Sequence, residues 1–134
     1  MSEDKFSQHY NIKNAKTIID DIKKVGVLKG IVLANRKGDV IVENFESGFE
    51  ANKYAAMCAS VLESAENLGK NIQSQKTGKI VAELMGGQSI VIIECTENLF
   101  FSLALEANSK INDIFSDIGR FCQEILSRNK KKKL

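Results

Sequence analysis

Hydrophobic residues recur along the chain with two periods, and these periods predict its secondary structure. Helical spacing of apolar residues predicts three helices, over residues 14–25, 50–73 and 109–127. Short apolar runs rich in β-branched residues predict five strands, over residues 28–35, 39–44, 79–85, 89–96 and 99–106. The order α-β-β-α-β-β-β-α predicts an α/β sandwich with a mostly antiparallel sheet. The long central helix is expected on one face and the terminal helices on the other.

Glycine-containing segments separate these elements and predict the turns. Residues 36–38 (RKG) are expected to join the first two strands, and Gly86 and Gly87 the third and fourth. Gly26 is expected to end the first helix in a left-handed conformation. The nearly continuous apolar run of residues 28–35 predicts a central strand covered on both faces, whereas residues 39–44 suit an edge.

The central helix carries more apolar surface than one core is expected to cover. Its apolar arc spans roughly 160°, against about 100° for a helix that lies on a single core. One flank holds Tyr54, Met57, Val61, Leu68 and Ile72, and the adjacent flank holds Ala51, Ala55, Cys58, Leu62, Ala65 and Gly69. The residues of the second flank are spaced alternately four and three apart, and most have small side chains, so another backbone could approach this flank closely. The pattern favours a helix between its own sheet and a second protein. A helix buried deeply inside one domain is the alternative.

Length and composition indicate one domain with polar ends. The chain has 134 residues, 43% of them hydrophobic, and we expect a polar segment at 1–11, a domain at 12–127 and a basic tail at 128–134. No apolar run is long enough to span a membrane, and residues 1–14 lack the apolar centre of a secretory signal.

The charge is unevenly distributed along the chain. Net charge is +2, yet Arg128 and Lys130–Lys133 supply five basic residues, which leaves 14 basic against 17 acidic in the rest. A broad nucleic-acid-binding face is therefore not expected. The tail is expected to be a solubilising segment, and contact with anionic lipid or nucleic acid is the alternative.

The residues that catalysis would need are sparse. The one histidine, His9, lies in the polar N-terminal segment, so no triad has an evident base. No metal-ligand spacing and no phosphate-binding loop occurs. The cysteines Cys58, Cys95 and Cys122 are odd in number and lie in apolar patterns, which predicts reduced core thiols in a cytoplasmic protein. We therefore expect a non-enzyme without cofactor or metal.

Three phrases of the chain together resemble the roadblock (dynein light chain roadblock-type) domain family. They are LKGIVLANRKGDVIVEN, YAAMCASVLESAENLG and KIVAELMGGQSIVIIECTENLFFSLAL, and the resemblance extends over about residues 14–126. It implies a sheet in the order 2-1-5-4-3. It also implies a dimer in which the long helices pack antiparallel and the edges of the third strands meet. The positions of this chain that the resemblance implies at the dimer interface are Ala51, Tyr54, Ala55, Cys58, Leu62, Ala65, Ile80, Ala82 and Leu84.

The resemblance also implies a function. Roadblock proteins regulate or scaffold Ras-like small GTPases, or serve as adaptors, so we expect a cytoplasmic homodimer that binds such a GTPase. The exposed polar helix positions expected at that contact are Asn52, Lys53, Ser60, Glu63 and Asn67. The first alternative is a structural adaptor without effect on nucleotide turnover. The second is a small-molecule sensor, for which the chain shows no convergent polar set.

Overall fold

A computed structural model describes residues 12–72, 78–109, 114–116, 118–120 and 122. The described elements are α2 (Ile12–Gly26), β1 (Leu28–Asn35), β2 (Val40–Asn44), α3 (Ala51–Ile72), β3 (Lys79–Glu83), β4 (Ser89–Glu94) and β5 (Leu99–Leu105). Residues 114–116 and 118–120 are helical, within the predicted last helix. The predicted elements are thus confirmed as far as they are described. The predictions for residues 1–11, with His9, and for residues 128–134 lie outside the described residues.

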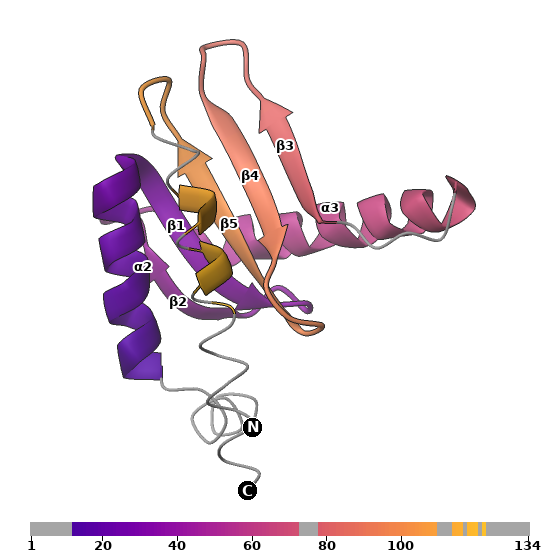
Figure 1. Ribbon diagram of the computed structural model, residues 1–134, viewed down its shortest axis with the longest axis horizontal. Coiled ribbons are helices and arrows are strands. Elements are labelled where there is room, and N and C mark those ends of the chain that lie inside the picture. The colour runs from indigo at the N-terminus through magenta and orange to yellow at the C-terminus, as the bar shows by residue number, and fades with distance from the viewer. Residues whose placement is uncertain (1–11, 73–77, 110–113, 117, 121, 123–134) are drawn as a thin grey trace, which may run out of the picture.

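The five strands form one antiparallel sheet in the order β2-β1-β5-β4-β3. The strand β1 is central and almost wholly buried, because β2 and β5 flank it and both sheet faces are covered there. The strands β3, β4 and β5 form a meander. The predicted fold class and strand order are confirmed, and Figure 1 shows α2 and α3 on opposite faces of the sheet.

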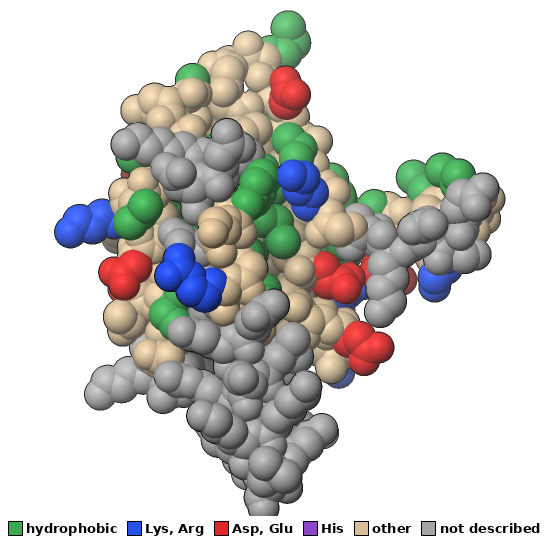
Figure 2. Space-filling view, viewed as in Figure 1, with side chains coloured by type: hydrophobic (Ala, Val, Ile, Leu, Met, Phe, Trp, Pro, Cys, Tyr) green, Lys and Arg blue, Asp and Glu red, His purple; other side chains and the backbone are tan. Residues whose placement is uncertain are grey.

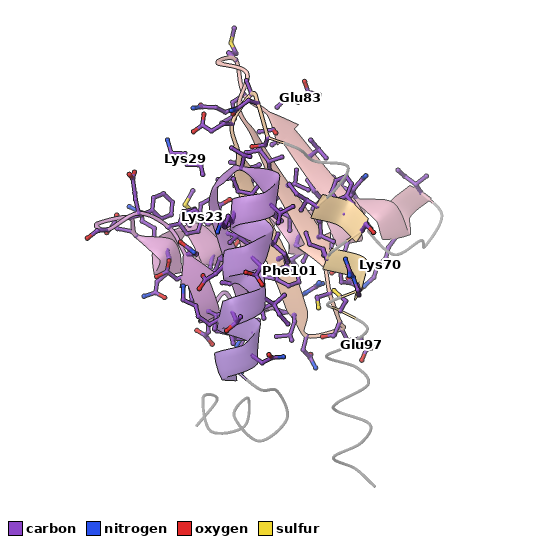
Figure 3. All side chains as sticks on the ribbon, turned by 60° about the vertical axis from the view of Figure 1, so that its left-hand side comes forward. Lys23, Lys29, Lys70, Glu83, Glu97 and Phe101 are labelled. Carbon is purple, nitrogen blue, oxygen red and sulfur yellow. The ribbon has the colours of Figure 1, made fainter. Side chains whose placement is uncertain are left out.

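One face of the sheet packs against α2 and the C-terminal helical residues. Ala15, Ile19 and Ile22 project from α2 at helical spacing and are buried. They share a cluster with Ile114 and Ile118, and with Phe101 of β5, which lies between the sheet and α2 (Figure 3). The alternation of β5 places Phe100 and Ser102 on the other face. The sheet therefore separates two cores, and α3 covers the second.

The first helix ends differently from the prediction. Gly26 is the last residue of α2, and the left-handed residue is Val27, with φ of 56°. The amide of Val27 still donates to the carbonyl of Lys24 over 3.3 Å, and its carbonyl accepts a 2.8 Å hydrogen bond from the Ser109 hydroxyl. These contacts hold a β-branched residue in a conformation that such residues rarely adopt.

The turn between β1 and β2 brings the sheet close to α3. Gly38 has φ of 92°, and a Cβ there would lie 2.7 Å from the Cα of Ala56. Glycine is therefore needed at this position both for the positive φ and for the close approach of the turn to α3. The Asn35 side chain supports the turn, because its Oδ1 accepts hydrogen bonds from the amides of Lys37 (3.0 Å) and Asp39 (2.9 Å).

Candidate protein-interaction surface

One flank of α3 is buried in the chain's own core. Its buried residues are Ala51, Ala55, Cys58, Ala59 and Leu62. All of them except Ala51 share a cluster with Val32, Ala34, Ile92 and Phe100 of the sheet. Most of these helix residues are small, which allows the helix to lie close to the sheet.

This burial corrects the sequence-based assignment of the two flanks. The small-residue pattern predicts that Ala51, Ala55, Cys58 and Leu62 face a second molecule, but Ala55 and Leu62 are 0% exposed within a single chain. Their small side chains bring α3 close to its own sheet rather than to a partner helix. Ala65, predicted on the same flank, is half-buried.

The other flank of α3 is apolar and exposed. Its exposed fractions are 61% for Met57, 47% for Val61, 63% for Leu68 and 74% for Ile72. Tyr54, Val61 and Leu68 follow one another at intervals of seven residues, so they lie along one side of the helix. Figure 1 shows the C-terminal part of α3 projecting past β3, and Figure 2 shows hydrophobic side chains on this projecting arm.

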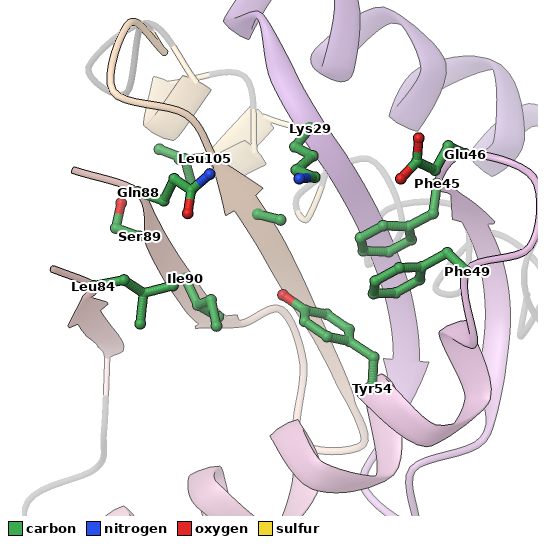
Figure 4. Close-up of a pocket in the computed structure, with 11 residues that line it drawn as sticks. Lys29, Phe45, Glu46, Phe49, Tyr54, Leu84, Gln88, Ser89, Ile90 and Leu105 are labelled. Atoms are coloured by element: carbon green, nitrogen blue, oxygen red, sulfur yellow. The ribbon is translucent and has the colours of Figure 1, made fainter. Parts of the chain in front are cut away.

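A groove of about 220 Å³ lies beside this flank, on the sheet face that α3 partly covers. Figure 4 shows Phe45, Phe49 and Tyr54 on one side of the groove and Leu84 and Ile90 on the other. The remaining lining residues are Lys29, Glu46, Gln88, Ser89, Ala104 and Leu105. Because its walls are mostly apolar, the groove suits hydrophobic side chains of a partner.

Three aromatic rings form the wall nearest α3. The rings of Phe45 and Phe49 stack with centroids 4.2 Å apart, and Tyr54 meets them edge-on at 5.1 and 5.5 Å. Phe45 lies directly over Gly30 of β1, where a Cβ would come within 2.1 Å of the ring. The position of this wall therefore depends on the absence of a side chain at residue 30.

Hydrogen bonds at Ser102 hold the N-terminal half of α3 on the sheet. The buried Ser102 hydroxyl lies 2.8 Å from the Tyr54 hydroxyl and 3.3 Å from the Cys58 sulfur. Burial raises the pKa of the Tyr54 phenol and that of the Cys58 thiol above their ordinary values. Both groups stay protonated at neutral pH, so Cys58 is a structural thiol and not a nucleophile.

Arg36 connects the second half of α3 to the sheet. It lies just after β1, and its guanidinium forms ion pairs with Glu66 of α3 and with Glu94 of β4, the latter at 3.3 Å. All three side chains are partly buried, which lowers the screening of their charges by water. These ion pairs restrain the second half of α3 relative to the sheet, as the hydrogen bonds at Ser102 restrain the first half.

The strand β3 forms one edge of the sheet and pairs, within the described part of the chain, with β4 alone. Among the predicted interface residues here, Ile80 is half-buried against the core under α3, Ala82 is exposed and Leu84 is 45% exposed. The outer amides and carbonyls of such an edge are available to another strand.

The polar helix positions predicted to contact a GTPase are all exposed. They are Asn52, Lys53, Ser60, Glu63 and Asn67. The structure thus brings together on α3 an apolar flank beside the groove and polar positions that face solvent. The sequence pattern missed Phe45 and Phe49, although two aromatic residues in the loop before a helix were a usable signal.

The described residues contain no group of three or more His, Cys, Asp or Glu side chains placed to hold a metal ion. No helix in the described part of the chain has the length and hydropathy needed to cross a bilayer. What this geometry offers is a surface for another protein: an apolar helix flank, a groove beside it and the edge of β3, which pairs only with β4 among the residues that the structure describes.

Comparison with known families agrees with this geometry. A family model described as Roadblock/LC7 domain matches residues 14–104. The chain belongs to the Roadblock/LC7 family. No curated protein sequence matches this roadblock chain.

Several solved structures share the fold of this chain. Myxococcus xanthus MglB matches with a TM-score of 0.80 and 12% identity, covering 90% of this chain and 91% of that one. A Roadblock/LC7 domain from Streptomyces avermitilis matches with a TM-score of 0.76 and 10% identity, covering 84% and 94%. The gliding protein MglB from Thermus thermophilus matches with a TM-score of 0.74 and 14% identity, covering 90% of each chain. The roadblock family is one of regulatory and scaffold domains.

Proposed function

We propose that this roadblock protein forms a symmetric homodimer through α3 and β3, and that the dimer regulates or scaffolds a Ras-like small GTPase in the cytoplasm. The observation that carries the proposal is the exposed apolar flank of α3 beside an apolar groove. Contiguous exposed apolar surface of this kind marks sites of protein association.

The length of α3 supports a second copy as the occupant. A helix of 22 residues is about 33 Å long. Five strands span only about 19 Å from the first axis to the last. The helix therefore extends past β3, where its own chain offers no described sheet to cover Leu68 and Ile72 (Figure 1).

The groove is the second apolar surface that a second copy would cover. Tyr54 lines the groove and lies on the same side of α3 as Val61 and Leu68, so the groove and the flank form one continuous surface. If a second α3 packs antiparallel on this flank, its C-terminal part lies over Leu84 and Ile90 of the first chain. A two-fold axis repeats the contact, so each projecting helix end covers the groove of the other chain.

The edge of β3 fits the same axis. Two β3 edges paired across it would extend the sheet to ten strands and satisfy the outer backbone groups of both. Self-association also occurs in a structural relative described as MglB with tetrameric arrangement, which is 13% identical and has a TM-score of 0.77.

The family resemblance suggests the partner. Two α3 helices side by side would present their outward residues as one platform for a GTPase. Its proposed contacts are Asn52, Lys53, Ser60, Glu63 and Asn67. The chain would act through the bound GTPase, with no catalytic group of its own. The free thiols of Cys58, Cys95 and Cys122 support a reducing, cytoplasmic location.

The homodimer is tested with Leu68→Glu, and Asn67→Glu serves as the matched control on the polar face. Light scattering should give the wild type and Asn67→Glu twice the chain mass of 14.8 kDa. It should give Leu68→Glu the mass of a folded monomer, because a charge would be buried in the dimer but not in the monomer. A wild type that stays monomeric at high micromolar concentration would refute the homodimer.

The GTPase is tested with Ras-like GTPases encoded in the same genome. Binding, hydrolysis and nucleotide exchange should be measured with GDP and with a GTP analogue. We expect nucleotide-dependent binding, weakened by Ser60→Glu in a protein that remains dimeric. Binding to none of these GTPases contradicts the proposal, and binding that ignores the nucleotide and leaves its turnover unchanged favours a structural adaptor.

A further inference from the structure

Cys95 continues the inward-facing side of β4. Val91 is fully buried, Ile93 packs against the core beneath α2, and Cys95 follows at the same two-residue spacing. The amide of Cys95 donates a 2.9 Å hydrogen bond to the carbonyl of Leu99, so the turn between β4 and β5 fixes its backbone. Its half-buried side chain packs against the core cluster that contains Val91.

Cys122 reaches the same cluster from the C-terminal helical residues. Ile114, Ile118 and Cys122 follow one another at intervals of four, so they lie on one side of a helix. Both isoleucines are buried in the core beneath α2, and Cys122 packs half-buried against it. The two cysteines thus approach each other from a strand end and from the helix that covers that strand.

The two thiol groups interact with each other. This interaction and burial both raise the pKa of Cys95, and the same interaction lowers the pKa of Cys122. Two neighbouring thiols of this kind can act in turn, because one sulfur attacks an oxidant and the other resolves the product. Cys58 lies in the other core and takes no part.

We propose that Cys95 and Cys122 form a redox-sensitive dithiol, which a small disulfide such as glutathione disulfide oxidises to an intramolecular disulfide that locks the C-terminal helical segment onto β4. This inference is independent of the proposed dimer and GTPase. Both residues are half-buried rather than fully enclosed, which leaves access for a small oxidant. Phe115, on the same segment, lies under the ammonium of Lys79 at 4.0 Å, so the lock would also hold this segment beside β3.

The reaction balances as thiol–disulfide exchange. The Cys122 thiolate attacks one sulfur of glutathione disulfide, which forms a mixed disulfide and releases one glutathione thiolate. Cys95 then loses its proton and attacks the Cys122 sulfur, so the protein disulfide forms and the second glutathione leaves. The two cysteines are oxidised by two electrons, glutathione disulfide is reduced by two, and the thiol protons pass to the two glutathiones.

The test equilibrates the full chain with reduced and oxidised glutathione over a range of ratios, followed by alkylation and mass spectrometry. Of the three thiols, one should remain alkylatable after oxidation, and peptide mapping should place it at Cys58. The Cys58→Ser variant should form the same cross-link, whereas Cys95→Ser and Cys122→Ser should not. Circular dichroism of each variant verifies that it is folded.

A second readout concerns the helical segment itself. Amides of residues 114–120 should exchange with deuterium at least several-fold more slowly in the oxidised wild type, with no such change in Cys95→Ser. Glutathione retained on either cysteine, a cross-link that includes Cys58, or unchanged exchange in a cross-linked chain would each overturn the proposal.

Discussion

The hydroxyl oxygens of Tyr54 in α3 and Ser102 in β5 lie 2.8 Å apart, and this contact joins the helix to the centre of the sheet. Ser102 is fully buried and also contacts the Cys58 sulfur at 3.3 Å. One small hydroxyl thus satisfies two side chains of α3, four residues apart. The same tyrosine lines the groove, so this contact also sets the wall of the interaction surface.

Removing the serine hydroxyl should therefore destabilise the domain. Ser102→Ala leaves Tyr54 and Cys58 without this partner, and we expect a loss of about 1–3 kcal/mol in the free energy of unfolding. Urea denaturation measures it, with Ser60→Ala on the exposed side of α3 as the control, for which we expect a change within about 0.5 kcal/mol. Equal effects of the two substitutions would contradict this role of Ser102.

The buried phenol also predicts a dependence on pH. Burial raises the pKa of Tyr54 above its ordinary 10.0, so above pH 10 the unfolded chain loses this proton while the folded chain keeps it. Stability should then fall as pH rises, by up to about 1.4 kcal/mol per pH unit for this group. Thermal unfolding from pH 8 to 11 tests this. Tyr54→Phe should flatten the alkaline decline, and an unchanged profile would exclude Tyr54 as its source.

Replacing Val27, which has a left-handed backbone conformation, should increase the stability of the domain. Asparagine tolerates a φ of 56° better than a β-branched residue, and the Val27 side chain is 43% exposed, so little burial is lost. We expect Val27→Asn to stabilise the domain by about 1 kcal/mol. The control is Val25→Asn, which is 53% exposed and lies inside α2, where asparagine should be neutral or destabilising. A loss of melting temperature in Val27→Asn would argue against strain at this residue.

A side chain at position 30 should displace the aromatic wall of the groove. Gly30→Ala places a Cβ against the Phe45 ring, and we expect a loss of about 1–3 kcal/mol from overpacking. The effect should shrink when Gly30→Ala is introduced into a Phe45→Ala background, since the clashing ring is then gone. A double-mutant cycle from urea denaturation measures this coupling. Additive effects would mean that the clash is relieved elsewhere.

The two flanks of α3 should respond differently to charge. Ala55→Glu buries a carboxylate in the core and should abolish cooperative folding, whereas Leu68→Glu should leave a folded monomer. Circular dichroism and thermal melts distinguish the outcomes, with Ser60→Glu as the control for an added charge on an exposed side. A folded, monomeric Ala55→Glu would restore the assignment first predicted from the small residues.

Local periodicity was sufficient for the elements of this fold. The strand predicted over 28–35 has those bounds in the structure, and the long helix begins one residue later than predicted. These features depend on contacts between residues close in the chain and on which side chains avoid water, so they can be read along the sequence. The strand order came from the resemblance of three phrases to a family, not from periodicity.

Tertiary structure decided which flank of α3 faces the sheet. Periodicity shows that an arc of the helix is apolar, but it does not show what lies against each half of that arc. In the folded chain the small residues of α3 pack against Val32 and Phe100 of the sheet, and Val61 and Leu68 remain exposed. Periodicity along the sequence also could not predict the groove or the Cys95–Cys122 pair, because each brings together residues that are distant in the chain. By itself, the sequence determined the elements and their family; only packing decided which apolar surfaces remain for a partner, since burial is a property of the folded whole.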